Sequence, residues 1–145
     1  RDRSRRSRQT WRMTLDEAAP AEPVDPLDLV ITAARAADDK QGRDTVVLEV
    51  GEVLSITSWF VVTSASNSRA VRAIVDHIEE KVDEAGGPKP NLVEGRDSMQ
   101  WVLMSYPDFV VHVFDQETRD YYELERLWRD VPTVDWESPE TADER

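Results

Sequence analysis

The hydrophobic pattern of the chain switches between helical spacing and continuous apolar runs. After Asp25-Pro26, a pair typical of a helix N-terminus, apolar residues recur every three or four positions. This spacing predicts a first helix that begins at Pro26 and ends near Gly42. A second helix, capped by Ser66 or Asn67, is predicted to be amphipathic. Its buried face is expected to consist of Val71, Ile74, Val75, Ile78 and Val82.

Short runs rich in β-branched and aromatic residues predict the strands. The runs cover residues 44–50, 58–65, 91–94 and the two arms of a hairpin within 99–114. A hairpin turn at Pro107-Asp108 would place Trp101 opposite Phe114. Both faces of this hairpin are largely apolar, which indicates a central position in a sheet that is covered on both sides.

A last apolar stripe predicts a third helix over residues 116–130. Tyr122 falls on its polar side, ~160° from the centre of the stripe at the angular step of a helix, and Arg119 is expected on that side too. The stripe comprises Leu124, Leu127, Trp128 and Val131. The element order is typical of an α/β domain with a mixed central β-sheet of about five strands flanked by helices.

The polar segments at both ends set the domain boundaries. Residues 1–12 contain six arginines and one aspartate, and residues 14–25 are rich in Pro, Ala and acid. We therefore expect a disordered or extraneous extension over 1–24, a folded domain over 25–131 and an acidic flexible tail over 132–145. If the chain is divided in this way, residues 1–20 and 133–145 should be dispensable for binding a partner.

Composition and charge narrow the function classes. The chain has no cysteine, which excludes disulfides and thiolate chemistry. It has no signal-peptide pattern and no apolar run of the ~18 residues that a membrane span needs, so a cytoplasmic protein without membrane contact is expected. The net charge is −12, and removing residues 1–12 leaves 12 basic and 29 acidic residues. An acidic body repels phosphate, so contact with nucleic acid is expected to be minor unless residues 1–12 act as a basic arm.

The residues that could carry chemistry are few. His112 lies between valines in a predicted strand. A structural histidine that hydrogen-bonds to a neighbouring residue is favoured there over a general base. The acidic residues at 79–84 lack a partner histidine or a calcium-loop pattern, so a solvated helix face is favoured. Residues 64–69 join a strand to a helix without a glycine for phosphate approach, so helix capping is favoured over anion binding. The sequence therefore predicts no catalytic, cofactor-binding or metal-binding residue.

Several short motifs occur in an order that resembles the ribosomal silencing factor family, also called the Iojap family. The motifs are 44–50, 56–62, 66–69, Glu94-Gly95, 101–103, 108–114 and, at the end, Arg119, Tyr122, Leu124, Glu125, Leu127 and Trp128. The resemblance implies a nucleotidyltransferase-like topology without the active site, and no enzymatic activity. It also implies binding to large-subunit ribosomal protein fourteen, which would block association with the small subunit and repress translation under nutrient limitation.

The resemblance also implies where the partner binds. The family's partner face draws on the hairpin and the final helix, so we expect contacts from Trp101, Tyr106 and Tyr122, with Leu103, Met104 and Asp108 as lesser candidates. The predicted register puts Trp101 and Tyr106 on opposite faces of the sheet. Three departures from the family pattern are Ser58 in place of an aspartate, and Ala65 and Pro107 in place of glycines.

Two other functions remain open at this stage. A nucleotidyltransferase-like enzyme would bind a nucleoside triphosphate with magnesium, although the acidic pair that such enzymes need is absent from the sequence. A dimeric scaffold would never co-sediment with ribosomes. A homodimer of the free protein is compatible both with a scaffold and with a silencing factor.

Overall fold

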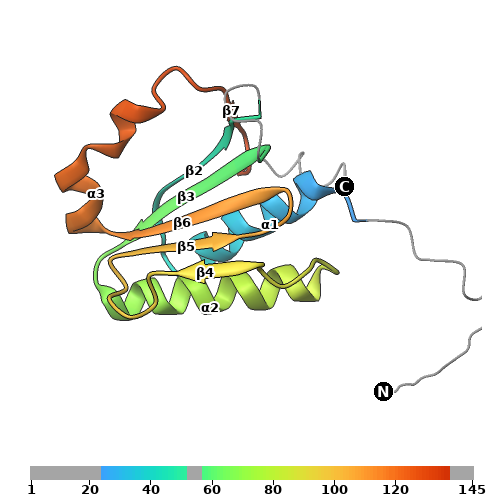
Figure 1. Cartoon of the computed structure of the whole chain (residues 1–145), viewed down its shortest axis with the longest axis horizontal. Coiled ribbons are helices and arrows are strands. Elements are labelled where there is room, and N and C mark those ends of the chain that lie inside the picture. The colour runs from blue at the N-terminus through green and yellow to red at the C-terminus, as the bar shows by residue number, and fades with distance from the viewer. Residues whose placement is uncertain (1–23, 52–56, 138–145) are drawn as a thin grey trace, which may run out of the picture.

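A mixed β-sheet forms the centre of the protein, as the computed structural model shows for residues 24–51 and 57–137 (Figure 1). Within these described ranges the sheet has six strands, in the order β4-β5-β6-β3-β2-β7. The elements are α1 (Pro26–Asp39), β2 (Arg43–Glu49), β3 (Trp59–Ala65), α2 (Ser68–Glu84), β4 (Leu92–Glu94), β5 (Trp101–Ser105), β6 (Phe109–Asp115), α3 (Gln116–Tyr122), the 3-10 helix η1 (Leu124–Leu127) and β7 (Thr133–Val134). The predicted α/β class with a mixed central sheet is confirmed.

The two long helices begin where their capping residues predict. The Asp25 carboxylate accepts a hydrogen bond from the Leu27 N–H at 3.0 Å, and Pro26 occupies the first turn. The Asn67 side chain caps α2 by accepting from the Ala70 N–H at 2.8 Å. The five residues predicted for the buried face of α2 are all buried. Helix α1 ends at Asp39, earlier than predicted, because Gln41 takes a left-handed backbone conformation with φ 65°.

The core of the sheet is a parallel pair with antiparallel neighbours. β3 pairs with β6 in parallel, and the other strand pairs are antiparallel. In the hairpin of β5 and β6, Trp101 pairs with Phe114 and the Tyr106 N–H donates to the Phe109 carbonyl at 2.8 Å, so the predicted turn and register are confirmed. β6 is therefore an interior strand, as the apolar character of both its faces predicts.

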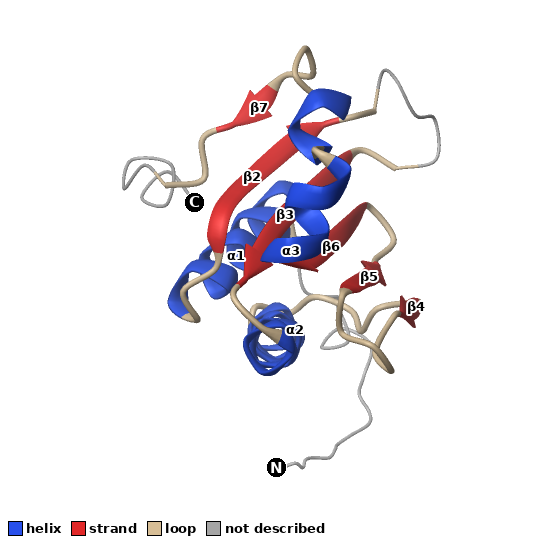
Figure 2. Ribbon diagram, turned by 90° about the vertical axis from the view of Figure 1, so that its left-hand side faces the viewer, coloured by secondary structure: helices blue, strands red, loops and turns tan. Residues whose placement is uncertain are grey.

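The two faces of the sheet are covered unequally. Helices α1 and α2 lie together on one face, whereas α3 lies on the other (Figure 2). Residues that alternate along the strands divide between two cores, with Val61 and Val111 packed under α1 and α2. The smaller core on the second face consists of Leu48, Val50, Val62 and Phe114, with Trp128 and Val131 packed against it. This second face stays partly open over β5 and β6.

The predicted third helix is wrong in length. α3 ends at Tyr122, because Glu123 adopts a left-handed conformation (φ 50°, ψ 52°), and a single 3-10 turn follows. Arg119, expected on the polar side, is instead buried with 1% exposure. Its Nε donates to Glu125 at 2.8 Å and its Nη1 donates to the Ser64 hydroxyl at 3.1 Å. A straight helix would turn Glu125 away from Arg119, six residues earlier, whereas the break at Glu123 allows this ion pair.

The apolar stripe of the predicted helix is dispersed by this break. Leu127 is 71% exposed, so its expected place in the core is wrong. Trp128 and Val131 are partly buried against the smaller core, as predicted. The side chain of Leu124 lies outside the described residues.

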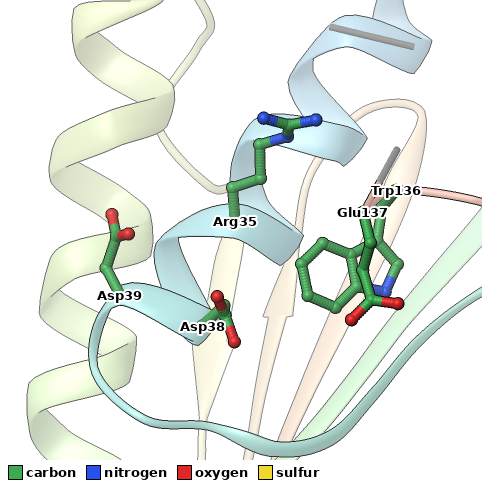
Figure 3. Close-up of a pocket in the computed structure, with 5 residues that line it drawn as sticks. All are labelled: Arg35, Asp38, Asp39, Trp136 and Glu137. Atoms are coloured by element: carbon green, nitrogen blue, oxygen red, sulfur yellow. The ribbon is translucent and has the colours of Figure 1, made fainter. Parts of the chain in front are cut away.

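Residues 132–137, predicted as the start of a flexible tail, belong instead to the folded domain. β7 pairs with β2, and Trp136 is 8% exposed, with its Nε1–H donating to the Thr45 carbonyl at 3.1 Å. Figure 3 shows its indole facing Arg35 and Asp38 of α1 across a pocket of about 520 Å³. The chain thus passes from the second face, around the β2 edge, to α1. Residues 1–23 and 138–145, where the remaining tail predictions fall, lie outside the described residues.

Replacing Trp136 by alanine should therefore destabilise the protein. Truncating a buried tryptophan removes packing worth about 3 kcal/mol or more and leaves the Thr45 carbonyl without its donor. Denaturant unfolding monitored by circular dichroism measures the loss. Tyr121→Ala, at a side chain with 77% exposure, is the matched control and should change stability by less than about 1 kcal/mol. Equal stability of the two variants would show that the segment after β7 does not anchor the fold.

Candidate partner-binding surface

An aromatic cluster occupies the open part of the second sheet face. Trp101 of β5 lies 4.9 Å from Phe114 and 6.4 Å from Tyr122 of α3, measured between ring centroids. His112 of β6 lies 4.6 Å from Phe60 of β3 in an edge-to-face arrangement. The strand alternation brings Trp101 and His112 to this face, and the start of α3 directly after β6 brings Tyr122 over them.

The outer layer of this cluster is exposed to solvent. Trp101 is 43% exposed, Tyr122 is 56% exposed, and Tyr121 packs edge-to-face against Tyr122 at 4.9 Å. Leu103, half-buried, follows Trp101 on the same face of β5. We call Trp101, Leu103, Tyr121 and Tyr122 the aromatic surface. Large exposed aromatic side chains are the groups that contribute most to protein–protein binding, because they bury much area while losing little conformational entropy.

A shallow pocket of about 420 Å³ adjoins the aromatic surface. Its walls are mainly aromatic and neutral polar, and Glu117 is the single charged group among the described residues that line it. The lining residues are Ser98, Gln100, Trp101, Glu117, Thr118, Tyr121 and Tyr122. Such a pocket suits a side chain of a protein partner. No group of three or more metal-ligating side chains occurs in residues 24–51 and 57–137.

His112 holds the inner layer of the cluster together. Its Nδ1 accepts a hydrogen bond from Trp101 Nε1–H at 3.2 Å. Burial lowers the pKa of His112 from 6.5 to about 4, so the ring is neutral at pH 7. The neighbouring group that hydrogen-bonds to His112, expected from the sequence, is thus the Trp101 indole. The other ring nitrogen, Nε2, is buried without a hydrogen-bond partner among the described residues.

The structure brings together three of the six residues predicted to contact a partner and separates the others. Trp101, Leu103 and Tyr122 share the open face. Asp108 is exposed at the hairpin turn, at the opposite end of the hairpin from Trp101.

Met104 and Tyr106 do not belong to this surface. Both are buried on the face covered by α1 and α2, with 0% and 2% exposure. Tyr106 stacks on Phe109 at 4.6 Å, and burial, reinforced by Glu79, raises the pKa of its phenol. Their prediction as contacts conflicts with the period of a strand, which turns alternate side chains to opposite faces.

Two residues of the cluster were missed from the sequence. The long predicted helix gives no reason to choose Tyr121, although this residue adjoins Tyr122 in the chain. The sequence predicts only a strand at Phe60, because its contact with His112 depends on the pairing of β3 with β6, which are far apart in the sequence.

The remaining candidate residues have structural partners. His77 Nε2 lies 3.2 Å from an Asp39 carboxylate oxygen and connects α2 to the end of α1. At the junction of β3 and α2, Asn67 acts as the helix cap. No helix in the described part of the chain combines the length and apolar character needed to cross a bilayer.

The lowered pKa of His112 predicts a dependence of stability on pH. The unfolded chain takes up a proton near pH 6.5, whereas the folded protein resists it until about pH 4, so stability falls as pH drops through this window. Between pH 7 and pH 5 this residue should remove about 2 kcal/mol from the free energy of unfolding. Urea unfolding of the wild type and of His112→Leu at both pH values measures this contribution. A loss of equal size in both proteins would contradict a neutral, buried His112.

Comparisons with known proteins agree with the motifs. The family model described as "Ribosomal silencing factor during starvation" matches residues 23–145. The chain is 37% identical to the ribosomal silencing factor of Bacillus subtilis over 103 residues, which cover 71% of this chain and 86% of that protein. It is 36% identical to that of Halalkalibacterium halodurans over 110 residues, which cover 76% and 93%. It is also 28% identical to the mouse protein named mitochondrial assembly of ribosomal large subunit protein 1, of which it covers 44%.

The fold is shared with solved structures. A crystal structure from Bacillus halodurans has a TM-score of 0.65 and 32% identity, covering 75% of this chain and 98% of that one. A crystal structure from Chromobacterium violaceum has a TM-score of 0.68 and 29% identity, covering 79% and 100%. With a family model that matches most of its length and relatives more than 30% identical, this chain belongs to the ribosomal silencing factor family.

Proposed function

We propose that the protein binds large-subunit ribosomal protein fourteen through the aromatic surface. Bound there, it blocks association of the large subunit with the small subunit and represses translation when nutrients are limiting. Membership of the ribosomal silencing factor family implies a partner on the ribosome. The name of the mouse relative refers to the large ribosomal subunit, which favours that subunit as the place of binding.

The single observation that supports this proposal most is the unequal covering of the sheet. One face is closed by α1 and α2, whereas the other presents Trp101 and Tyr122 to solvent, 6.4 Å apart. Two neighbouring aromatic side chains, each about half exposed, leave apolar area that a partner can cover. The cluster beneath them is fixed by strand pairing and ring contacts, so the surface is largely formed before the partner arrives.

The charge of the chain favours a protein as the direct contact. The net charge is −12, and Glu117 lines the pocket beside the aromatic surface. An acidic surface repels the phosphates of ribosomal RNA and attracts basic ribosomal proteins. Contact with RNA is therefore a minor part of the proposed interface.

The protein should prevent subunit joining in a purified system. Light scattering rises when small and large subunits associate, and adding the protein to the large subunits beforehand should suppress that rise in a dose-dependent way. The effect should also disappear when the small subunits are added first and association is complete. Normal association at a saturating dose of the protein would contradict the proposal.

Replacing Tyr122 by alanine should weaken binding to large subunits without unfolding the protein. Truncation of an aromatic residue at the centre of an interface typically costs about 2 to 4 kcal/mol, or roughly 30- to 900-fold in affinity. Tyr122 is 56% exposed, so its thermal unfolding temperature should change little. Sedimentation with purified large subunits measures the affinity, and circular dichroism measures the stability.

Two matched variants control this experiment. Trp128→Ala removes a side chain that packs against the smaller core, so it should chiefly lower stability. Glu80→Ala, on the exposed side of α2 beyond the opposite face of the sheet, should change neither property. If Tyr122→Ala binds like the wild type, or unfolds as readily as Trp128→Ala, the partner does not bind at the aromatic surface.

A further inference from the structure

The orientation of the Trp101 indole depends on a hydrogen bond from its own ring. Within the described residues, Nε1–H donates to His112 Nδ1, at 3.2 Å. The two residues are diagonal neighbours on one face of the hairpin, since Trp101 pairs with Phe114 and His112 pairs with Leu103. The hydrogen bond therefore ties an exposed side chain at the start of β5 to the interior strand β6.

The imidazole is itself held in place by its neighbours. Phe60 contacts it edge-to-face at 4.6 Å, and the Phe114 ring lies nearly parallel to it, with 6.2 Å between centroids and an interplanar angle of 10°. Because these rings come from β3 and β6, the central parallel pair of the sheet, the acceptor atom is held by strands that are paired on both sides. The hydrogen bond then ties Trp101 to these interior strands.

The chemistry of the two side chains fixes the proton positions. An indole nitrogen only donates, so His112 Nδ1 must be unprotonated and the neutral ring carries its hydrogen on Nε2. Burial keeps the ring neutral by lowering the pKa of His112 to about 4. The acceptor is consequently available throughout the physiological pH range.

Histidine is an unfavourable choice here for stability alone. Its Nε2 is buried without a hydrogen-bond partner among the described residues, and a buried unsatisfied donor is destabilising. A leucine would fill the space between Phe60 and the hairpin without leaving a polar atom unpaired. The gain that offsets this loss is the acceptor offered to Trp101, a side chain with 43% exposure that contributes little to the core.

We propose that His112 is a positioning residue for the partner interface: its Nδ1 holds the Trp101 indole, beside Tyr122, in the orientation that the ribosomal partner binds. This inference rests on the proposed function, because it concerns the same surface. His112 does not belong to the exposed layer, and it acts on the partner through Trp101. Fixing the indole beforehand removes the loss of rotamer freedom that binding would otherwise incur.

Two substitutions separate positioning from packing. His112→Leu keeps an apolar side chain of similar size and removes the acceptor. His112→Asn keeps an acceptor at the position of Nδ1, because its amide oxygen is the same number of bonds from the backbone. We expect His112→Leu to bind purified large subunits roughly 3- to 10-fold more weakly, with no decrease in thermal unfolding temperature at pH 7. His112→Asn should bind within about twofold of the wild type even where it is less stable.

Nuclear magnetic resonance of the free protein tests the hydrogen bond without ribosomes. The indole N–H signal of Trp101, assigned by its absence in Trp101→Phe, should keep its chemical shift from pH 8 to pH 5.5 in the wild type. In His112→Leu it should move upfield and exchange faster with solvent, as expected when the acceptor is removed. An indole signal that is unchanged in His112→Leu would overturn the proposal.

The binding outcomes distinguish this proposal from the proposed function. If the wild type binds large subunits and Tyr122→Ala binds weakly, but His112→Leu binds like the wild type, the positioning role is wrong and the proposed function stands. If His112→Leu and His112→Asn lose affinity equally and both unfold at lower temperature, His112 has only a structural role, which also overturns the proposal. A wild type that does not bind large subunits would remove both.

Discussion

The buried guanidinium of Arg119 determines how the C-terminal part of the chain lies on the sheet. A buried charge is strongly unfavourable unless it is paired and hydrogen-bonded. Arg119 is paired with Glu125 at 2.8 Å and also donates to the Ser64 hydroxyl at 3.1 Å and the Arg43 carbonyl at 3.3 Å. These contacts connect α3 to the ends of β2 and β3. Because Glu125 reaches Arg119 only after the break at Glu123, the same charge accounts for the short α3 and for the position of Tyr122 at its end.

The rest of the C-terminal segment follows from that arrangement. After η1 the chain covers the smaller core with Trp128 and Val131, adds β7 to the edge of β2, and inserts Trp136 against α1. It stabilises the half of the second face that lies over β2 and β3. The part over β5 is left open, and there Trp101, Leu103 and Tyr122 form the aromatic surface with Tyr121. The open area is thus a consequence of where the segment is anchored.

The sequence predicts the parts of this fold whose signals are local. The caps at Asp25 and Asn67, the buried face of α2 and the hairpin register all depend on residues close in the chain, and all are confirmed. The C-terminal elements depend on contacts over long separations, such as Arg119 with Ser64 and Trp136 with Thr45, which no periodicity reveals. Of the predicted contact residues, Trp101 and Tyr122 are singled out by their aromatic character, and the structure places them together on the open face. Tyr106 is buried instead, because strand alternation turns it to the opposite face from Trp101.

The central claim is that the open half of the second face is the part of the protein that meets the large subunit. Site-specific photo-crosslinking tests it most directly, with benzoylphenylalanine placed at Tyr121 on the aromatic surface or at Glu80 on α2. After irradiation with purified large subunits, mass spectrometry should identify ribosomal protein fourteen as the product from position 121 and no specific product from position 80. Cross-links from position 121 to ribosomal RNA or to another protein, or the same product from both positions, would contradict the account.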